Sequence, residues 1–160
     1  MDLVAAALAF FGKKKQASGN GTNGGSEDAG PKSTILVIDD DSSFLETMRI
    51  LLSGAGYNVL TSTTGPKGLD MVRYAPRVKA VLLDFNMPGF NGAETLQYLR
   101  KLNPSLKVIA VSGLKASELP PAFQKSVTRF MAKPFSNGEL LETVAELTGN
   151  PSAAGVSATA

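Results

Sequence analysis

Short apolar runs alternate with amphipathic stretches through the middle of the chain, between residues 32 and 149. Five of these runs contain β-branched or aromatic residues, and we predict that they are strands. The first, third and fourth are almost continuously apolar, which is typical of parallel strands covered on both faces. The predicted strands are Thr34–Ile38, Asn58–Thr61, Ala80–Leu83, Lys107–Val111 and Thr128–Met131.

Stretches with helical periodicity lie between and after these strands. The predicted helices start near Ser43, Pro66, Asn91 and Ser136, and a further one covers Ser117–Lys125. Ser43 and Ser136 are each followed three residues later by a glutamate, which is the spacing of a capping box. The helix over 117–125 is a poor one, because Pro120 and Pro121 lie inside it. Gly149 predicts the end of the last helix.

Five strand–helix units in succession imply an α/β fold, a doubly wound parallel sheet with helices on both faces. We expect one domain over residues 32–149. Residues 1–11 are an apolar N-terminal segment, 12–31 a Gly- and Ser-containing flexible linker, and 150–160 a flexible tail of small residues. Sheets of this kind place their functional site at the carboxyl ends of the strands.

Composition narrows the possible chemistry. The 160 residues suit one domain, and they include no cysteine and no histidine. The chain therefore has no disulfides, no thiolate metal site and no histidine-based catalysis. A net charge of +2 gives no evidence of nucleic-acid binding. No apolar run approaches the roughly 20 residues that span a bilayer, so we expect a cytoplasmic protein.

Polar residues follow four of the predicted strands. Asp39, Asp40 and Asp41 come after the first strand, Asp84 after the third, Ser112 after the fourth and Lys133 after the fifth. Each residue type also has an ordinary structural role, since Asp caps helices, Ser forms turns and Lys is usually solvated. Capping does not explain three adjacent carboxylates that face a fourth, because like charges repel unless something neutralises them.

The charges at these strand ends predict a divalent cation. Asp39, Asp40 and Asp84 contribute −3 and Lys133 returns +1, so a divalent ion balances the remainder. Oxygen donors without His or Cys favour Mg²⁺. An aspartate beside such an ion can attack phosphorus, while the ion, Lys133 and the Ser112 hydroxyl hold the charge of the transferring group.

The strand-end motifs are those of a known family. They are ILVIDDD (35–41), VLLDFNMPGFNG (81–92), VIAVSG (108–113) and FMAKPF (130–135). On these four stretches, residues 32–149 resemble the receiver domain of two-component response regulators. The resemblance implies a flavodoxin-like sheet with strand order 2-1-3-4-5. It also implies that Asp84 is the phosphoacceptor and that Asp39 and Asp40 are the acidic pair that binds Mg²⁺, with Asp40 as the expected direct ligand.

The same resemblance assigns the remaining site residues. Asn86 would contribute its backbone carbonyl to the metal, and Ser112 would move toward the phosphoryl group. Lys133 would pair with the phosphoryl oxygens, with Pro134 after it in cis. Phe130 matches the aromatic switch position, where it lacks the hydroxyl of the commoner tyrosine and would act by packing alone.

We therefore expect a stand-alone receiver that is phosphorylated on Asp84 by a histidine kinase or a His-containing phosphotransfer protein, with Mg²⁺. It would catalyse its own phosphorylation and dephosphorylation and signal through partner binding or a phosphorelay, without direct DNA binding. One alternative is a haloacid-dehalogenase-type phosphatase, because Asp39–Ser43 also fits D-x-D-x-[ST], although the further acidic motif of that family is missing. Another is a degenerate receiver that acts only as a docking module.

The first eleven residues suggest a separate role. Leu3, Val4, Leu8 and Phe11 fall on one helical face, and three lysines follow. Residues 1–15 could therefore tether the protein to a membrane surface or to a partner. A loosely packed terminus would account for the same pattern.

Overall fold

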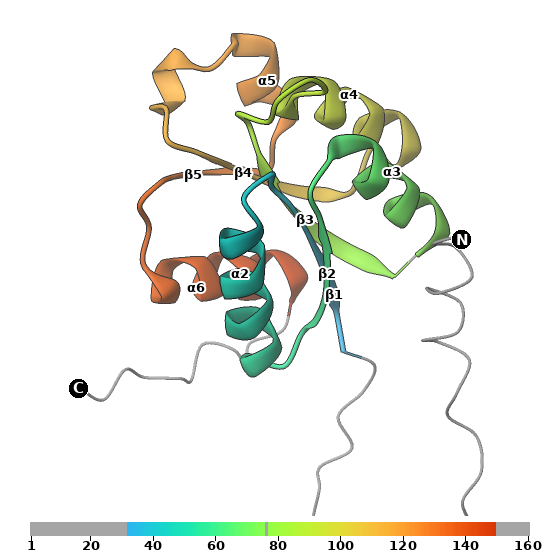
Figure 1. Ribbon diagram of the computed structural model, residues 1–160, viewed down its shortest axis with the longest axis vertical. Helices are drawn as coiled ribbons and strands as arrows, with labels where there is room; N and C mark the ends of the chain where they lie inside the picture. Colours follow the sequence, from blue (N-terminus) through green and yellow to red (C-terminus); the bar gives the residue numbers. More distant parts are fainter. Residues whose placement is uncertain (1–31, 76, 150–160) are drawn as a thin grey trace, which may run out of the picture. The chain divides into compact units, whose positions relative to one another are not determined.

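The computed structural model describes residues 32–75 and 77–149 (Figure 1). The expected N-terminal segment (1–11), linker (12–31) and tail (150–160) lie outside the described residues, and so does the candidate tether. No helix within the described residues combines the length and the apolar character needed to cross a membrane.

The described residues form one parallel sheet with five strands. Its strands are β1 (Thr34–Ile38), β2 (Asn58–Ser62), β3 (Val78–Asp84), β4 (Lys107–Ser112) and β5 (Arg129–Ala132). The spatial order is β2-β1-β3-β4-β5, and every neighbouring pair is parallel. The expected doubly wound sheet and its strand order are thus confirmed. The chain first crosses from β1 to β2 and then from β2 past β1 to β3, so the strand order reverses between β1 and β3.

Helices cover both faces of this sheet. They are α2 (Ser42–Gly54), α3 (Gly65–Tyr74), α4 (Gly92–Leu102), α5 (Pro121–Ser126) and α6 (Asn137–Thr148), with a 3₁₀ turn, η1 (Ala116–Glu118). Figure 1 shows α2 and α6 together on one side of the sheet, with α3, α4 and α5 on the other. This two-sided cover explains why β1, β3 and β4 are buried almost throughout.

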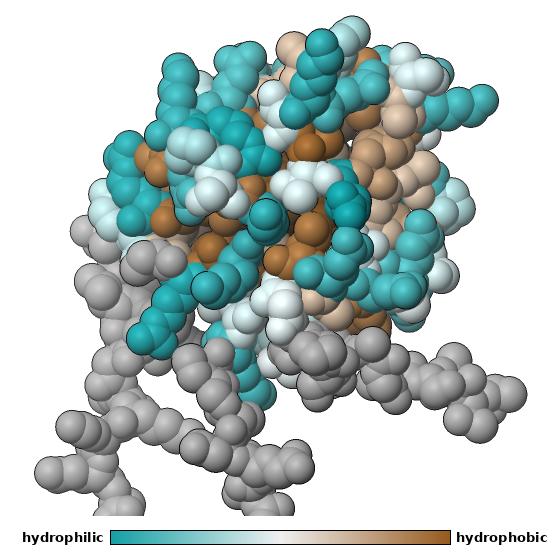
Figure 2. Space-filling model, turned by 180° about the vertical axis from the view of Figure 1, so that it is seen from behind, coloured by the Kyte–Doolittle hydropathy of each residue, from teal (hydrophilic) through white to brown (hydrophobic). Residues whose placement is uncertain are grey.

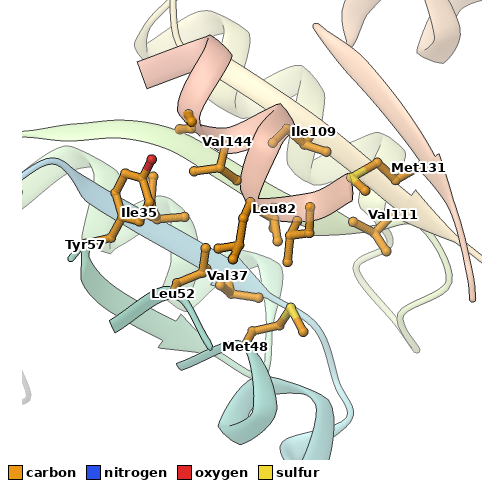
Figure 3. Close-up of a cluster of buried hydrophobic side chains, with 14 of the residues drawn as sticks. Ile35, Val37, Met48, Leu52, Tyr57, Leu82, Ile109, Val111, Met131 and Val144 are labelled. Carbon is orange, nitrogen blue, oxygen red and sulfur yellow. The ribbon is translucent and has the colours of Figure 1, made fainter. Parts of the chain in front are cut away.

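Alternate residues of each strand build two separate cores. The first lies between the sheet and the helices α2 and α6, and Figure 3 shows Leu82 near its centre, with Val144 of α6 and Met48 of α2 packed around it. The second lies between the sheet and the other helices and includes Leu83, Leu96 and Phe123. Burial at this level stabilises the fold by roughly 2 kcal/mol for each large side chain.

The outer surface is mostly polar. Figure 2, turned by 180° from the first view, shows hydrophilic residues over much of this face, with smaller hydrophobic areas between them. Large apolar residues with substantial exposure in the described part are Ile50, Tyr74, Tyr98 and Leu102. Scattered exposed residues of this kind are normal on a folded domain.

The start of α2 corrects one prediction from the sequence. The cap is Asp41, whose carboxylate accepts hydrogen bonds from the backbone N–H groups of Ser43 (2.8 Å) and Phe44 (3.2 Å). The capping box predicted from Ser43 and Glu46 is therefore wrong. Ser43 already lies inside the helix, because the chain turns directly after the Asp39–Asp40 pair and Asp41 is the first residue that can reach the free N–H groups.

We expect Asp41→Ala to lower the free energy of unfolding by about 1 kcal/mol, because two N–H groups at the start of α2 lose their acceptor. Ser43→Ala should change it by less than about 0.5 kcal/mol, since alanine is favoured within helices. Urea unfolding of both variants measures the difference. A larger loss for Ser43→Ala than for Asp41→Ala would contradict this assignment of the cap.

The other helix ends agree with the sequence more closely. Asn91 and Glu94 form a reciprocal capping box at α4. Ser136 caps α6 by accepting from the Glu139 N–H at 3.1 Å, which is one half of the predicted box. Gly149 ends α6 with a φ of 69°, a conformation that costs glycine little.

The predicted helix over 117–125 is divided in the structure. The 3₁₀ turn ends at Glu118, and α5 begins only at Pro121. Pro120 and Pro121 lie at the start of α5 rather than in its interior, where the missing N–H groups would not be bonded in any case. The prolines therefore limit α5 to the residues that follow them and leave the preceding residues as a separate 3₁₀ turn.

Candidate functional site

The candidate site lies where β1 and β3 end side by side. Ile38 and Leu83 are paired in the register of these neighbouring strands, and an aspartate follows each of them. Asp39 comes just beyond β1, and Asp84 is the last residue of β3. The two carboxylates therefore meet at the carboxyl edge of the sheet, next to the point where the strand order reverses.

Three carboxylates converge at this edge. One oxygen from each of Asp39, Asp40 and Asp84 lies within 4.8 Å of the others. Asp39 and Asp84 are buried, whereas Asp40 is exposed to solvent. The cluster therefore has a buried floor and one carboxylate on the solvent side.

Lys133 joins the two buried carboxylates. Its ammonium donates to Asp39 Oδ2 at 2.8 Å and to Asp84 Oδ1 at 3.2 Å. Its backbone N–H donates to the Ser112 carbonyl at 2.7 Å, which fixes the segment just after β5 against the end of β4. The Lys133–Pro134 peptide bond is cis, as the resemblance implies. One side chain thus connects the ends of β1, β3 and β5.

Burial and neighbouring charges shift the pKa values of both Asp84 and Lys133. Burial is the main cause that raises the pKa of Asp84, and the nearby charge of Asp39 adds to it. Lys133 and a hydrogen bond from the Asn86 backbone favour the ionised form without cancelling this effect. Burial disfavours the Lys133 ammonium, but the hydrogen bond to Asp39 and the charge of Asp84 outweigh it and raise the pKa of Lys133.

The donor set fits a hard divalent cation. The three carboxylates offer only oxygen, the donor that Mg²⁺ prefers, and no His or Cys exists in the chain to compete. With all groups ionised, −3 from the carboxylates and +1 from Lys133 leave two negative charges. Asp40 presents its carboxylate to solvent, from which an ion with bound water molecules can approach.

The structure places Ser112 at the same edge of the sheet. It ends β4 and is fully buried, one residue beyond the Val111 that pairs with Asp84. Its hydroxyl oxygen accepts the backbone N–H of Leu114 at 3.1 Å. A hydroxyl that accepts in this way still has its own proton to donate.

The other two residues that the resemblance singles out lie farther out. Asn86 follows β3 and is exposed, and its backbone favours the ionised form of Asp84, which by itself lowers the pKa of that carboxyl. Phe130 lies on β5 and is partly buried. It packs against the second core, which includes Phe123 and Leu119. Phe130 is therefore a packing residue of the second core, on the strand that precedes Lys133.

A glycine closes the loop after Asp84. The Gly92 N–H donates to the Phe85 carbonyl at 3.1 Å, which brings the start of α4 onto the end of β3. A Cβ atom at position 92 would lie 2.7 Å from the Phe85 Cα and would also collide with the Asp84 carbonyl. Only glycine allows this approach, so the loop that follows the buried carboxylate is held tightly against it.

The structure adds one residue that the sequence analysis did not assign to the site. The Lys133 ammonium lies 4.2 Å from the centroid of the Phe44 ring, within the range of a cation–π interaction. Phe135 packs edge-on against Phe44, with the centroids 6.2 Å apart. The available signal was the position of Phe44 in the first turn after the Asp39–Asp41 run, close to the same strand end.

Together, the fold and the site define a doubly wound α/β protein with an acidic oxygen-donor cluster at its switch point. Comparison with known protein families matches residues 35–145 to the response regulator receiver domain. The chain therefore belongs to the response regulator receiver family of two-component signalling. The dehalogenase-type alternative is not supported by this match, and the glutamates that follow Lys133 lie along α6 rather than among the clustered carboxylates.

Known proteins similar to this chain support the same family. Cell cycle transcriptional regulator CtrA of Caulobacter vibrioides is 29% identical over 113 residues, which cover 69% of this chain and 48% of CtrA. This chain spans about half the length of the curated relatives it matches.

Solved structures agree with the fold. A CheY-like receiver domain protein from Methanospirillum hungatei is 28% identical with a TM-score of 0.69, covering 75% of this chain and 97% of its own. TrrA of Thermotoga maritima, solved in complex with Mg²⁺ and BeF, is 28% identical with a TM-score of 0.65, covering 72% and 98% respectively.

Proposed function

We propose that this protein accepts a phosphoryl group on Asp84 in a Mg²⁺-dependent reaction. The observation that carries the proposal is the convergence of Asp39, Asp40 and Asp84 within 4.8 Å, with the Lys133 ammonium bonded to two of them. Asp39 and Asp40 would hold the cation with Asp84 and the Asn86 carbonyl. When bound, Mg²⁺ supplies positive charge that offsets the carboxylates and the incoming phosphoryl oxygens.

In the proposed step, one oxygen of Asp84 attacks the phosphorus of the donor. A new O–P bond forms, and the bond from phosphorus to the donor's nitrogen or oxygen breaks, with its electron pair leaving on the donor. The product is an acyl phosphate, in which the negative charge has moved from the carboxylate to the phosphoryl oxygens. The step requires Asp84 to be ionised, and the charge of Lys133 favours that form.

Lys133 and Ser112 would then donate hydrogen bonds to the phosphoryl oxygens, which carry the negative charge after transfer. Lys133 already donates to Asp84 Oδ1 at 3.2 Å, so a short movement transfers this hydrogen bond to a phosphoryl oxygen. Ser112 lies at the end of the next strand, and its hydroxyl proton would satisfy a second phosphoryl oxygen. Because the Lys133 N–H is bonded to the Ser112 carbonyl, movement of one is linked to the backbone of the other.

We propose a histidine kinase or a His-containing phosphotransfer protein as the phosphoryl donor. The output would be binding of a protein partner or onward transfer of the phosphoryl group, with Phe130 changing its packing on β5. Direct DNA contact is not part of the proposal.

The test is phosphorylation with acetyl phosphate in the presence of Mg²⁺ or of excess EDTA. We expect one phosphoryl group per chain, sensitive to hydroxylamine, only when Mg²⁺ is present. Borohydride reduction and peptide mass spectrometry should locate it at Asp84. Labelling of Asp39 instead would favour dehalogenase-type chemistry. No labelling, with intact binding of a kinase, would mean a docking module and would overturn the proposal.

A further inference from the structure

We propose that Phe44 positions the Lys133 ammonium for phosphoryl transfer by a cation–π interaction. This inference rests on the proposed function and adds a residue to it. Phe44 lies in the first turn of α2, far from Lys133 in sequence, and its ring centroid is 4.2 Å from Lys133 Nζ. Neither the motifs nor the charge pattern of the chain singles out this residue.

Hydrogen bonds to Asp39 and Asp84 occupy only part of the Lys133 ammonium, and the rest of it can contact the Phe44 ring. A lysine ammonium has three N–H donors, and Asp39 and Asp84 accept two hydrogen bonds from it. The Lys133 side chain is still 30% exposed, so water could compete for the group from the open side. The Phe44 ring covers part of the ammonium and excludes water there without accepting one of its N–H groups in a directed hydrogen bond.

This last property suits a lysine that has to change partners. A carboxylate or amide at position 44 would hold the ammonium by a directed hydrogen bond, which would have to break during transfer. An aromatic face attracts the cation over a broad area, so Lys133 can move from Asp84 Oδ1 toward a phosphoryl oxygen and remain in contact with the ring. The flexible lysine stem is thereby restricted before the donor binds.

The ring itself is held by the core. Phe44 packs against the first hydrophobic core, and Phe135 supports it edge-on at 6.2 Å between centroids. Phe135 lies two residues after Lys133, so the ring is fixed both by α2 and by the segment that carries the ammonium. Small movements of that segment would therefore carry the ring and the lysine together.

The first test needs neither metal nor phosphodonor. In NMR spectra of the full chain, the Lys133 ε-CH₂ protons should be shifted upfield by the ring current of Phe44. Phe44→Leu should remove this shift, and Phe44→Tyr should retain it. Thermal unfolding of each variant establishes that it is folded. Identical ε-CH₂ shifts in the wild type and a folded Phe44→Leu variant would overturn the proposed contact.

The second test separates electrostatics from packing. Phenylalanines with one, two and three ring fluorines, placed at position 44 alone, keep the shape of the ring but weaken its attraction for cations. We expect the rate of phosphorylation by acetyl phosphate at saturating Mg²⁺ to fall stepwise, reaching about three- to tenfold below wild type with three fluorines or with Phe44→Leu. Phe44→Tyr should retain the rate within about twofold.

The outcomes distinguish this inference from the function on which it rests. If wild type takes up no phosphate, the proposed function fails, while the NMR result still decides whether the ring and the ammonium are in contact. If wild type is phosphorylated normally and the fluorinated series shows no trend, Phe44 is a packing residue and only the inference fails. Equal loss in all fluorinated forms, independent of fluorine number, would likewise overturn it.

Discussion

Asp84→Asn should abolish the uptake of hydroxylamine-sensitive phosphate, whereas Asp41→Asn should be phosphorylated at the wild-type rate. Both substitutions remove one carboxylate from the same end of the sheet. Asp84 is buried, is bonded to Lys133 and lies within the group of three carboxylates. Asp41 is exposed and caps α2, a role that asparagine fills as well as aspartate. The amide that Asp84→Asn introduces is not a nucleophile for phosphorus, so the expected loss is complete.

The measurement is a time course with acetyl phosphate and Mg²⁺, quantified by intact-mass spectrometry before and after hydroxylamine. Phosphorylation of Asp84→Asn at the normal level would mean that another residue is the acceptor. Equal losses in Asp84→Asn and Asp41→Asn would mean that the general negative charge of this edge matters, and not the particular position of Asp84. Similar unfolding curves for both variants would exclude misfolding as the cause.

Lys133→Met should lower the free energy of unfolding by about 2 kcal/mol at pH 7 without divalent ions. Removing one partner of a fully buried ion pair costs about 3–5 kcal/mol, because the remaining charge is left unpaired. Lys133 is 30% exposed, and water screening reduces this figure. Asp39 and Asp84 would then face each other in a buried site without the ammonium between them.

The loss of stability in Lys133→Met should increase with pH between about pH 4 and neutral pH. The pKa of Asp84 is raised in the folded state, so its ionisation opposes folding as pH rises from its ordinary value of 3.8 through the raised value. Without Lys133 this penalty grows, so the loss in Lys133→Met should be largest near neutral pH and small below pH 4. The pKa of Lys133 is itself raised, so while its carboxylate partners are ionised its stabilising contribution is complete below pH 10.5 and is lost only above that value.

Urea unfolding at pH 4 and pH 7 measures this difference, with Lys125→Met as the control. Lys125 is exposed on α5, so its substitution removes the same charge from the surface. We expect Mg²⁺ at millimolar concentration to recover part of the stability of Lys133→Met, because the cation would offset the same carboxylates. A loss that is the same at both pH values would show that the lysine stem, and not its charge, stabilises the fold.

The sheet could be predicted from the sequence because strands that are buried on both faces consist almost entirely of apolar residues. Val37, Leu82 and Ile109 belong to nearly unbroken apolar runs, and such runs allow few structures other than central parallel strands. The meeting of Asp39 with Asp84 followed from that topology, since neighbouring parallel strands end at one edge. The parallel sheet predicted that both aspartates lie at its carboxyl edge, and the family resemblance supplied the strand order that makes β1 and β3 neighbours.

Other features depend on how the elements pack, and here the sequence was ambiguous. Asp41 and Ser43 are both good capping residues two positions apart, and only the path of the chain after β1 decides between them. The contact between Phe44 and Lys133 depends on the rotation of α2 relative to the segment after β5. Because apolar residues on a helix face the core anyway, the periodicity of α2 does not distinguish a ring in the core from one over an ammonium.

The close approach of Gly92 to β3 has a consequence for how this protein tolerates change. The backbone of α4 rests directly on the residues that end the strand, with no side chain between them to yield or be remodelled. Residues on the outer face of α4 can be substituted, but Gly92, where the helix contacts the end of β3, cannot. Substitutions on the outer face of α4 can therefore accumulate without moving the backbone that follows Asp84.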